Sequence, residues 1–269
     1  MEFTISPFKT SNLNQLTQLP PKEWQSNVYE LFLHNEWQPW FFPYQAMVAN
    51  KLAGFGMFFL FEENAWLGWI LVDKKFRNQG IGTAITTQMV EKAKELGAKN
   101  LILTATELGM PIYEKLGFRI SSHYRFFNPP ELIKPIYERS KIRPASKKDL
   151  NRIMDLDTEA TGEKRTELIR YYLEDCFVYE NIEVTGFYMP NFGNGYVVAS
   201  NRDSGIELLN FRLKKNKKCI AIPDQNEIAI EYFLQNGFTE GYKIPRMILG
   251  KEPAWKPGMI FSRAAGYCG

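Results

Sequence analysis

The stretch Phe-Arg-Asn-Gln-Gly-Ile-Gly-Thr at residues 76–83 places two glycines one residue apart. It follows an apolar run, residues 66–72, and precedes a segment in which apolar residues recur every three or four positions from Ile81 to Leu96. That period predicts an amphipathic helix. A helix that begins at a glycine turn presents unpaired backbone amides and a partial positive charge, so the stretch is suited to binding phosphate.

Two common phosphate-binding loops do not fit these residues. A Walker-type loop needs a lysine after its last glycine, and none follows Gly82. A dinucleotide-binding loop needs a third glycine or alanine, where this sequence has the bulky Ile85. A tight turn that uses glycine only for its backbone conformation stays open as an alternative.

The pattern around the glycine turn predicts a mixed α/β fold. Short connections between the first apolar runs indicate an antiparallel meander, and the helix after the turn indicates a crossover to a parallel strand. The predicted strands are residues 45–49, 56–61, 65–72, 100–106 and 120–127, and the predicted helices are residues 81–96 and 109–116.

Two motifs together resemble the GNAT (N-acetyltransferase) superfamily, over residues of about 45 to 120. Arg77, Gly80 and Gly82 match its Arg/Gln-x-x-Gly-x-Gly/Ala loop, and the run from Tyr113 to Phe118 matches Tyr-x-x-x-Gly-Phe. The resemblance implies acetyl-coenzyme A as cofactor and a parallel strand pair that splays apart to admit the thioester. The cofactor-binding residues that it implies are Leu71, Val72, Arg77, Asn78, Gln79, Gly80, Ile81, Gly82, Thr83 and Thr106, the last at a position where the family often has asparagine.

The resemblance also implies that Tyr113 is the general acid. A phenol has a pKa of about 10, so it carries its proton at neutral pH and can give it to a departing thiolate. A core tyrosine without a catalytic role is the alternative. The general base stays open among four side chains and a chain of water molecules; the side chains are Glu62, Glu63, Asp73 and His123.

We expect the acceptor to be an amine of a small molecule or peptide. Five aromatic residues are candidates to line its pocket, although each is equally suited to a core: Trp37, Trp40, Phe41, Trp66 and Trp69. A coenzyme A-binding sensor or regulatory module without turnover is the alternative function, because no base stands out.

The second half of the chain resembles the first. Residues 142–153 begin like residues 5–16, and Phe233 to Phe238 echoes Tyr113 to Phe118, about 120 residues apart. We therefore predict two tandem GNAT-like domains, residues 1–138 and 139–269, each a mixed, mostly antiparallel twisted sheet flanked by helices. Asp203 near the expected phosphate position and Phe233 in place of the tyrosine indicate that the second copy is degenerate, although Asn226 keeps the family's asparagine.

Composition excludes several other classes. The 269 residues carry a net charge of only +3, which gives no reason to expect nucleic acid as a partner, and the basic run 212–218 is interpreted as a solvated turn. Three scattered cysteines and two isolated histidines predict no metal site. The first residues lack a signal-peptide pattern and no apolar run is long enough to cross a bilayer, so we expect a cytoplasmic monomer or dimer.

Overall fold

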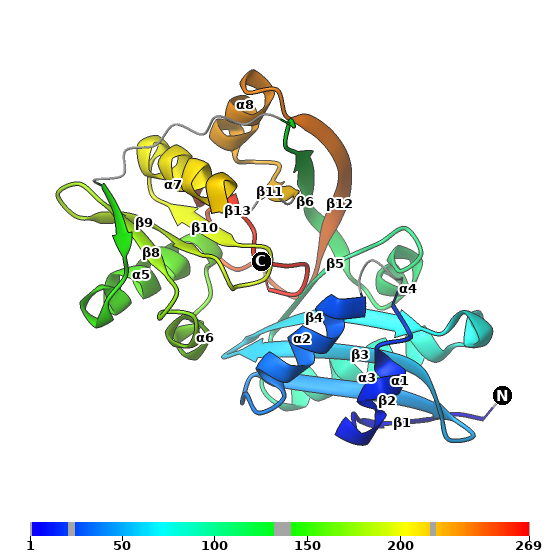
Figure 1. Ribbon diagram of the computed structural model, residues 1–269. Helices are drawn as coiled ribbons and strands as arrows, with labels where there is room; N and C mark the ends of the chain where they lie inside the picture. Colours follow the sequence, from blue (N-terminus) through cyan, green and yellow to red (C-terminus); the bar gives the residue numbers. More distant parts are fainter. Residues whose placement is uncertain (1, 21–24, 132–140, 216–218, 269) are drawn as a thin grey trace. The chain divides into compact units, whose positions relative to one another are not determined.

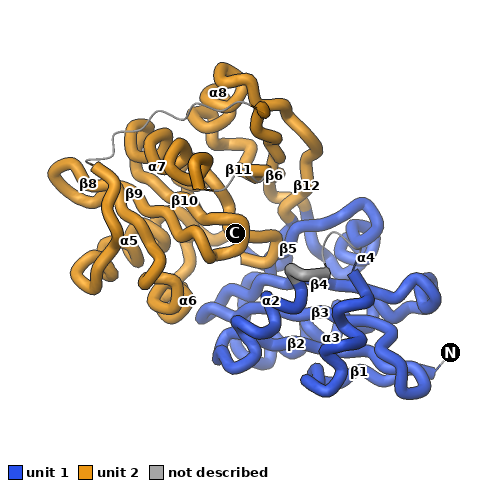
Figure 2. Tube along the Cα trace, in the orientation of Figure 1, with its two compact units in different colours: residues 1–119, 247–251 blue, residues 120–246, 252–269 orange. Residues whose placement is uncertain are grey.

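The computed structural model describes residues 2–20, 25–131, 141–215 and 219–268, except for the side chains of residues 25–27 (Figure 1). The chain forms two compact units, residues 1–119 with 247–251 and residues 120–246 with 252–269 (Figure 2). These units differ from the consecutive segments 1–138 and 139–269. Most of strand β6, Arg119–Asn128, belongs to unit 2, and the end of strand β12, Thr239–Leu249, belongs to unit 1. The prediction of two related domains concerns ancestry and stays a prediction.

Unit 1 contains the predicted antiparallel meander. Strands β1 to β4 pair antiparallel with their neighbours in chain order, and β4 pairs parallel with β5. The last residues of β12 follow β5. The strands are β1 Thr4–Pro7, β2 Phe41–Val48, β3 Lys51–Phe61, β4 Asn64–Val72 and β5 Asn100–Thr104. β2 starts earlier than predicted because Pro43, although it lacks an amide hydrogen, lies within the strand opposite Met57.

Helices cover both faces of the unit 1 sheet. α3, Ile81–Glu95, packs on one face, where a Cβ at Gly54 or Gly56 would lie 2.8 or 2.7 Å from the side chain of Ile85. Those two glycines therefore allow the helix to approach the sheet closely. On the other face, Phe32 of α2, Gln25–Asn35, contacts Phe41 with ring centroids 5.8 Å apart. The short helices are α1, Leu13–Leu16, and α4, Met110–Lys115.

Unit 2 contains two groups of strands. One has the order β13-β10-β9-β8-β7, and the other has the order β12-β6-β11. The strands are β7 Ile142–Pro144, β8 Phe177–Glu180, β9 Val184–Met189, β10 Tyr196–Ala199, β11 Ile220–Pro223 and β13 Ile260–Ser262. The helices are α5 Leu150–Thr161, α6 Thr166–Tyr171, α7 Arg202–Lys215 and α8 Glu227–Gln235. Phe127, Leu208 and Phe233 belong to one buried core of strands and helices.

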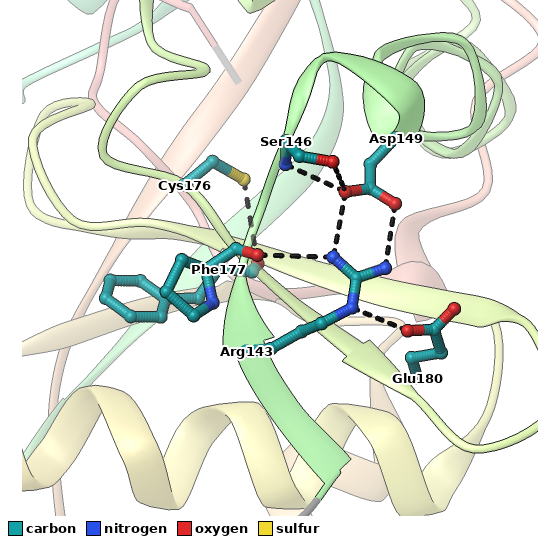
Figure 3. Close-up of polar contacts among 7 residues, drawn as sticks. Arg143, Ser146, Asp149, Cys176, Phe177 and Glu180 are labelled. Carbon is teal, nitrogen blue, oxygen red and sulfur yellow. Dashed lines mark hydrogen bonds and ion pairs between the residues drawn. The ribbon is translucent and has the colours of Figure 1, made fainter.

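The connection between β7 and α5 in unit 2 is held by a cluster around Arg143 (Figure 3). The Arg143 guanidinium donates two 2.8 Å hydrogen bonds to the Asp149 carboxylate and one to Glu180. This bidentate pairing holds the pKa of Asp149 well below its usual range. Ser146 and Asp149 cap the turn that leads into α5. Burial raises the pKa of the nearby Cys176 thiol, so we interpret the cluster as structural rather than reactive.

Candidate active site

The glycine turn forms the start of α3. Gly80 is the N-terminal cap, with φ +81°, and the helix begins at Ile81. The preceding turn is tied to the end of β4, because Asp73 accepts a 2.8 Å hydrogen bond from the backbone of Lys75 and Arg77 Nε donates to the carbonyl of Val72 at 3.2 Å. Asp73 is therefore a turn-forming residue.

The backbone around Gly80 and Gly82 is accessible. A Cβ at Gly80 would meet no atom within 4 Å, and one at Gly82 would meet only Ile112 at 3.4 Å and Val72 at 3.5 Å. Arg77, Asn78, Gln79 and Thr83 are exposed, whereas Ile81 is buried beneath the helix. The amides of the first turn have no partner four residues back, so this end of α3 fits an anion such as the diphosphate of coenzyme A.

Strand β4 is irregular beside this turn. Trp69 has φ +51°, and the pairing with β3 shifts between Phe55, opposite Leu71, and Met57, opposite Gly68. The parallel pairing with β5 ends at Leu67 and Leu103, although β4 continues to Val72. Gly68 to Val72 are half-buried, so their edge toward β5 has no strand neighbour within the described part of the chain. The pairing ends where β5 itself ends, at Thr104, so the parting of the two strands to admit a thioester stays a prediction.

Tyr113 lies on α4 and is 7% exposed. Burial raises the pKa of its phenol to about 12, so the hydroxyl is protonated at neutral pH. Its ring packs edge-on against Phe118, with centroids 6.1 Å apart. Thr106 lies at the start of this helix, where its hydroxyl accepts a 3.3 Å hydrogen bond from the amide of Gly109.

Gly109 is a residue that sequence analysis missed. A Cβ there would lie 2.8 Å from Cε2, 2.9 Å from Oη and 3.0 Å from Cζ of Tyr113, so only glycine leaves room for the phenol. The sequence signal was its spacing, since Gly109 stands four residues before Tyr113, about one helical turn.

A Gly109→Ala substitution is expected to displace the Tyr113 hydroxyl. Because a misplacement of about 1 Å can cost about 10²-fold in rate, we expect kcat to fall about 10- to 100-fold. Steady-state kinetics of the full chain measures the effect. Gly258→Ala is the matched control, because the atom nearest its Cβ is the Gln225 carbonyl oxygen at 4.0 Å. In a Tyr113→Phe background the same change should add little, and an equal additional loss would mean that Gly109 acts through another group.

The side chains considered as general base lie in turns or form ion pairs. Glu63 pairs with Lys99 at 2.8 Å, which lowers the pKa of its carboxyl and makes it a weaker base. Glu62 has φ +50° and forms the turn between β3 and β4. His123 lies on β6, with Nδ1 3.9 Å from Asp224 in unit 2. None of these side chains gains support as the base, and the water-chain alternative stays a prediction.

The aromatic candidates for the acceptor pocket fall into two groups. Trp40, Phe41 and Trp66 are buried core residues, with exposed fractions of 6%, 6% and 1%. Trp37 is 86% exposed, and Trp69 lies in the irregular part of β4. Of these five residues, Trp69 alone lies in the stretch of β4 that does not pair with β5.

In unit 2, strand β13 lies between two other strands. Strand β13 pairs antiparallel with β10, and the amide of Arg263, which follows it, donates to the carbonyl of Ala221 in β11. The side-chain amide of Asn226 donates a 2.9 Å hydrogen bond to the carbonyl of Ile260. A Cβ at Gly205 of α7 would lie 2.1 Å from the Phe261 ring. β13 therefore fills the space between β10 and β11.

One interpretation of the second half was wrong. Arg212, read as part of a solvated turn, lies in α7 and is fully buried. Its Nη2 donates to the carbonyl of Asn194 at 2.8 Å, and its Nε donates to that of Gly195 at 3.4 Å. Residues 216–218 of the same run lie outside the described residues. Asp203 lies in the first turn of α7 and is exposed, as expected for a solvated carboxylate.

The described residues contain neither a metal-binding cluster nor a membrane-spanning helix. Across the described residues, no three His, Cys, Asp or Glu side chains come together in a way that would hold a metal ion. In the same part of the chain, no helix combines the length and the apolar character needed to cross a membrane.

The mixed sheet flanked by helices, with a helix start suited to a diphosphate, matches the fold of GNAT-type acetyltransferases. Residues 10–118 match the acetyltransferase (GNAT) family. This segment is therefore similar to the acetyltransferases of that family, and the similarity supports an N-acetyltransferase that uses an acyl-coenzyme A.

The similar proteins agree with this assignment. The uncharacterized N-acetyltransferase YitH of Bacillus subtilis is 23% identical over 239 residues, which cover 82% of each chain. A crystal structure of a putative acetyltransferase from Pyrococcus horikoshii has a TM-score of 0.85 at 20% identity and covers 99% of this chain and 96% of its own. A tandem GNAT protein from the clavulanic acid biosynthesis pathway has a TM-score of 0.60 at 13% identity and covers 92% and 98%. These two structures have folds similar to that of this chain.

Proposed function

We propose that the protein transfers an acetyl group from acetyl-coenzyme A to an amine of a small molecule or peptide, which attacks the thioester directly. The observation that carries the proposal is the accessible start of α3 at Gly80, beside the stretch of β4 from Gly68 to Val72 that β5 leaves uncovered. A helix start binds a diphosphate, and a free strand edge binds an extended amide-containing chain.

Different residues would bind the diphosphate and the pantetheine arm of the cofactor. Backbone amides from Gln79 to Thr83 would hold the diphosphate, and the exposed Arg77 adds positive charge while its Nε anchors the loop to Val72. The main chain of Leu71 and Val72 lies where a pantetheine arm would run, although the carbonyl of Val72 already accepts a hydrogen bond from Arg77. When bound, the cofactor supplies the activated acetyl group.

Tyr113 would hold the proton that the departing sulfur takes up. Its phenol, with a pKa of about 12, is a donor rather than an acceptor of protons at neutral pH. The amine must arrive neutral or lose its proton to water, because the carboxylates of Glu63 and Asp73 are engaged by Lys99 and by the backbone of Lys75. Packing against Gly109 would fix the direction of the phenol.

Calorimetry with acetyl-coenzyme A and a free-thiol assay over a panel of amines, amino acids and peptides test the proposal. We expect 1:1 binding of the cofactor and release of free thiol with at least one class of amine. Absence of binding at high micromolar cofactor would remove the proposal. A coenzyme A-binding sensor is the second candidate function, because no side chain is placed as base; it predicts binding without thiol release for any amine.

The second unit is not expected to bind the cofactor. β13 lies between β10 and β11, the Asn226 amide is engaged by Ile260, and Phe233 has no proton to give. These contacts support a single catalytic site. The calorimetric stoichiometry should therefore be one cofactor per chain, and a value of two would contradict this.

The pH dependence follows from the raised pKa of Tyr113. Because the acid must be protonated, activity is lost only above its pKa, and a value of about 12 places that loss beyond the range of ordinary assays. We expect kcat/KM to rise as the amine and base deprotonate and then to stay level to pH 10. A descending limb near pH 9–10 that disappears in Tyr113→Phe would contradict the assignment.

A further inference from the structure

Unit 2 contains a buried guanidinium without a counterion. Arg263, directly after β13, is 8% exposed, and its Nη1 is buried without a hydrogen-bond partner. Within the described ranges it forms no ion pair, and burial lowers the pKa of its guanidinium. Of the three other buried arginines, Arg165 contacts Asp157 at 2.6 Å and Arg246 contacts Glu252. Arg212 has no ion pair among the described residues, but the carbonyls of Asn194 and Gly195 accept hydrogen bonds from its guanidinium.

The guanidinium contacts two aromatic rings. Its carbon is 4.5 Å from the ring centroid of Tyr124 and 5.2 Å from that of Phe126. The two rings are two residues apart on β6 and therefore share one face of the strand. The rings attract the cation but offer no acceptor in their plane for its N–H groups.

A second unpartnered donor lies beside it. The hydroxyl of Tyr124 is buried without a hydrogen-bond partner, and the residue is 1% exposed. Burial raises the pKa of this phenol despite the neighbouring Arg246 and Arg263, so the hydroxyl carries its proton. Buried polar groups are nearly always hydrogen-bonded, and two unsatisfied donors side by side indicate a missing acceptor.

Two stacked aromatic rings extend from Arg263 to the exposed surface of unit 2. Phe126 is half-buried and stacks on Tyr242 of β12, with centroids 4.2 Å apart and planes 21° from parallel. Tyr242 is 62% exposed. The rings of Tyr242 and Phe126 therefore form a continuous row of aromatic contacts between the exposed surface and Arg263.

We propose that Arg263 and Tyr124 bind an oxyanion, the carboxylate or phosphate of a small molecule whose body lies against Phe126 and Tyr242. An arginine fork with a tyrosine hydroxyl matches the two oxygens of either group. The site consists of unit 2 residues alone, so it stands whether or not unit 1 transfers acetyl groups.

Calorimetry on the full chain tests the site with three probes: benzoate, inorganic phosphate and the neutral analogue benzamide. We expect saturable 1:1 binding of at least one anion and none of benzamide. Binding of benzoate alone assigns the site to carboxylates, and binding of phosphate alone assigns it to phosphates. Absence of binding of both anions at tens of millimolar would overturn the proposal.

Two variants connect the binding to these residues. Tyr124→Phe removes the unpartnered hydroxyl while keeping the ring, and Arg263→Lys keeps the charge while losing the fork; each should weaken anion binding about 10-fold or more. Arg125→Lys is the matched control, because Arg125 neighbours Tyr124 on β6 but is paired with Asp224 and Glu240. Unchanged affinity in Tyr124→Phe would overturn the proposal even if Arg263→Lys fails to fold.

Stability without a probe separates binding from a structural role. Because the Tyr124 hydroxyl has no partner, Tyr124→Phe should melt at or above the temperature of the wild-type chain. A clear loss of melting temperature would mean that the hydroxyl has a structural partner, which would also overturn the proposal. Gly82→Asp, designed to abolish cofactor binding, should leave benzoate and phosphate binding unchanged, so the two sites can fail separately.

Discussion

Replacing Tyr113 by phenylalanine is expected to lower kcat by about 10²- to 10⁴-fold, the range that a positioned general acid contributes. The ring remains, so its packing against Gly109 and Phe118 is kept and the fold should be unaffected. The cofactor loop is separate from the phenol, so the Kd for acetyl-coenzyme A should be unchanged. Steady-state kinetics and calorimetry on the same preparation measure both quantities.

Tyr29→Phe is the matched control for this substitution. Tyr29 lies on α2 and is 40% exposed, so removing its hydroxyl should change neither kcat nor affinity. If Tyr113→Phe turns over within about twofold of the wild-type chain, Tyr113 is not the acid and is a core tyrosine, as the alternative interpretation of the sequence holds. Loss of cofactor binding together with turnover would instead indicate a disturbed fold.

Gly82→Asp is expected to weaken acetyl-coenzyme A binding by about 100-fold or more. The new carboxylate would stand in the first turn of α3, where the diphosphate is proposed to bind. Two unit charges about 4 Å apart near a protein surface repel by about 4 kcal/mol, which exceeds the 2.7 kcal/mol of a 100-fold change. Space is available, because a Cβ at Gly82 contacts Ile112 and Val72 only at 3.4 and 3.5 Å.

The same substitution should leave the fold intact or slightly more stable. An acidic residue in the first turn of a helix interacts favourably with the helix dipole, by about 0.3–1 kcal/mol. Affinity and melting temperature are therefore expected to move in opposite directions. Gln88→Glu is the control, since it makes the same charge change further along α3. Equal affinity in Gly82→Asp and Gln88→Glu would show that the diphosphate binds elsewhere.

The loop and its helix could be predicted from the sequence because their signals are local. Glycine at positions 80 and 82, followed by apolar residues at a helical period, defines both the turn and the start of α3 within a few residues. The motif around Tyr113 placed the phenol on the next short helix in the same way. The irregular backbone at Trp69 had no such signal, because it depends on how Gly56 and its neighbours in β3 pair with β4.

Residues whose state depends on distant partners were not predictable. Arg212 stands in a run of positive charge that is typical of a solvated segment, yet it is buried because the carbonyls of Asn194 and Gly195 accept its hydrogen bonds. Gly109 is required as glycine only because the Tyr113 ring occupies the space of its Cβ. The unpaired state of Arg263 is likewise visible only once its neighbours are known.

The sequence by itself indicated the class of the protein, the loop proposed to bind the cofactor and the residue proposed as acid, since each is carried by residue types at short and fixed spacing. Only the tertiary structure decided which strands complete each unit. The Arg119 guanidinium donates a hydrogen bond to the carbonyl of Gly250, which is 131 positions away. In unit 2, β13 lies between β10 and β11. Strand pairing uses backbone groups that every residue has, so composition and period do not specify a partner more than a hundred residues away.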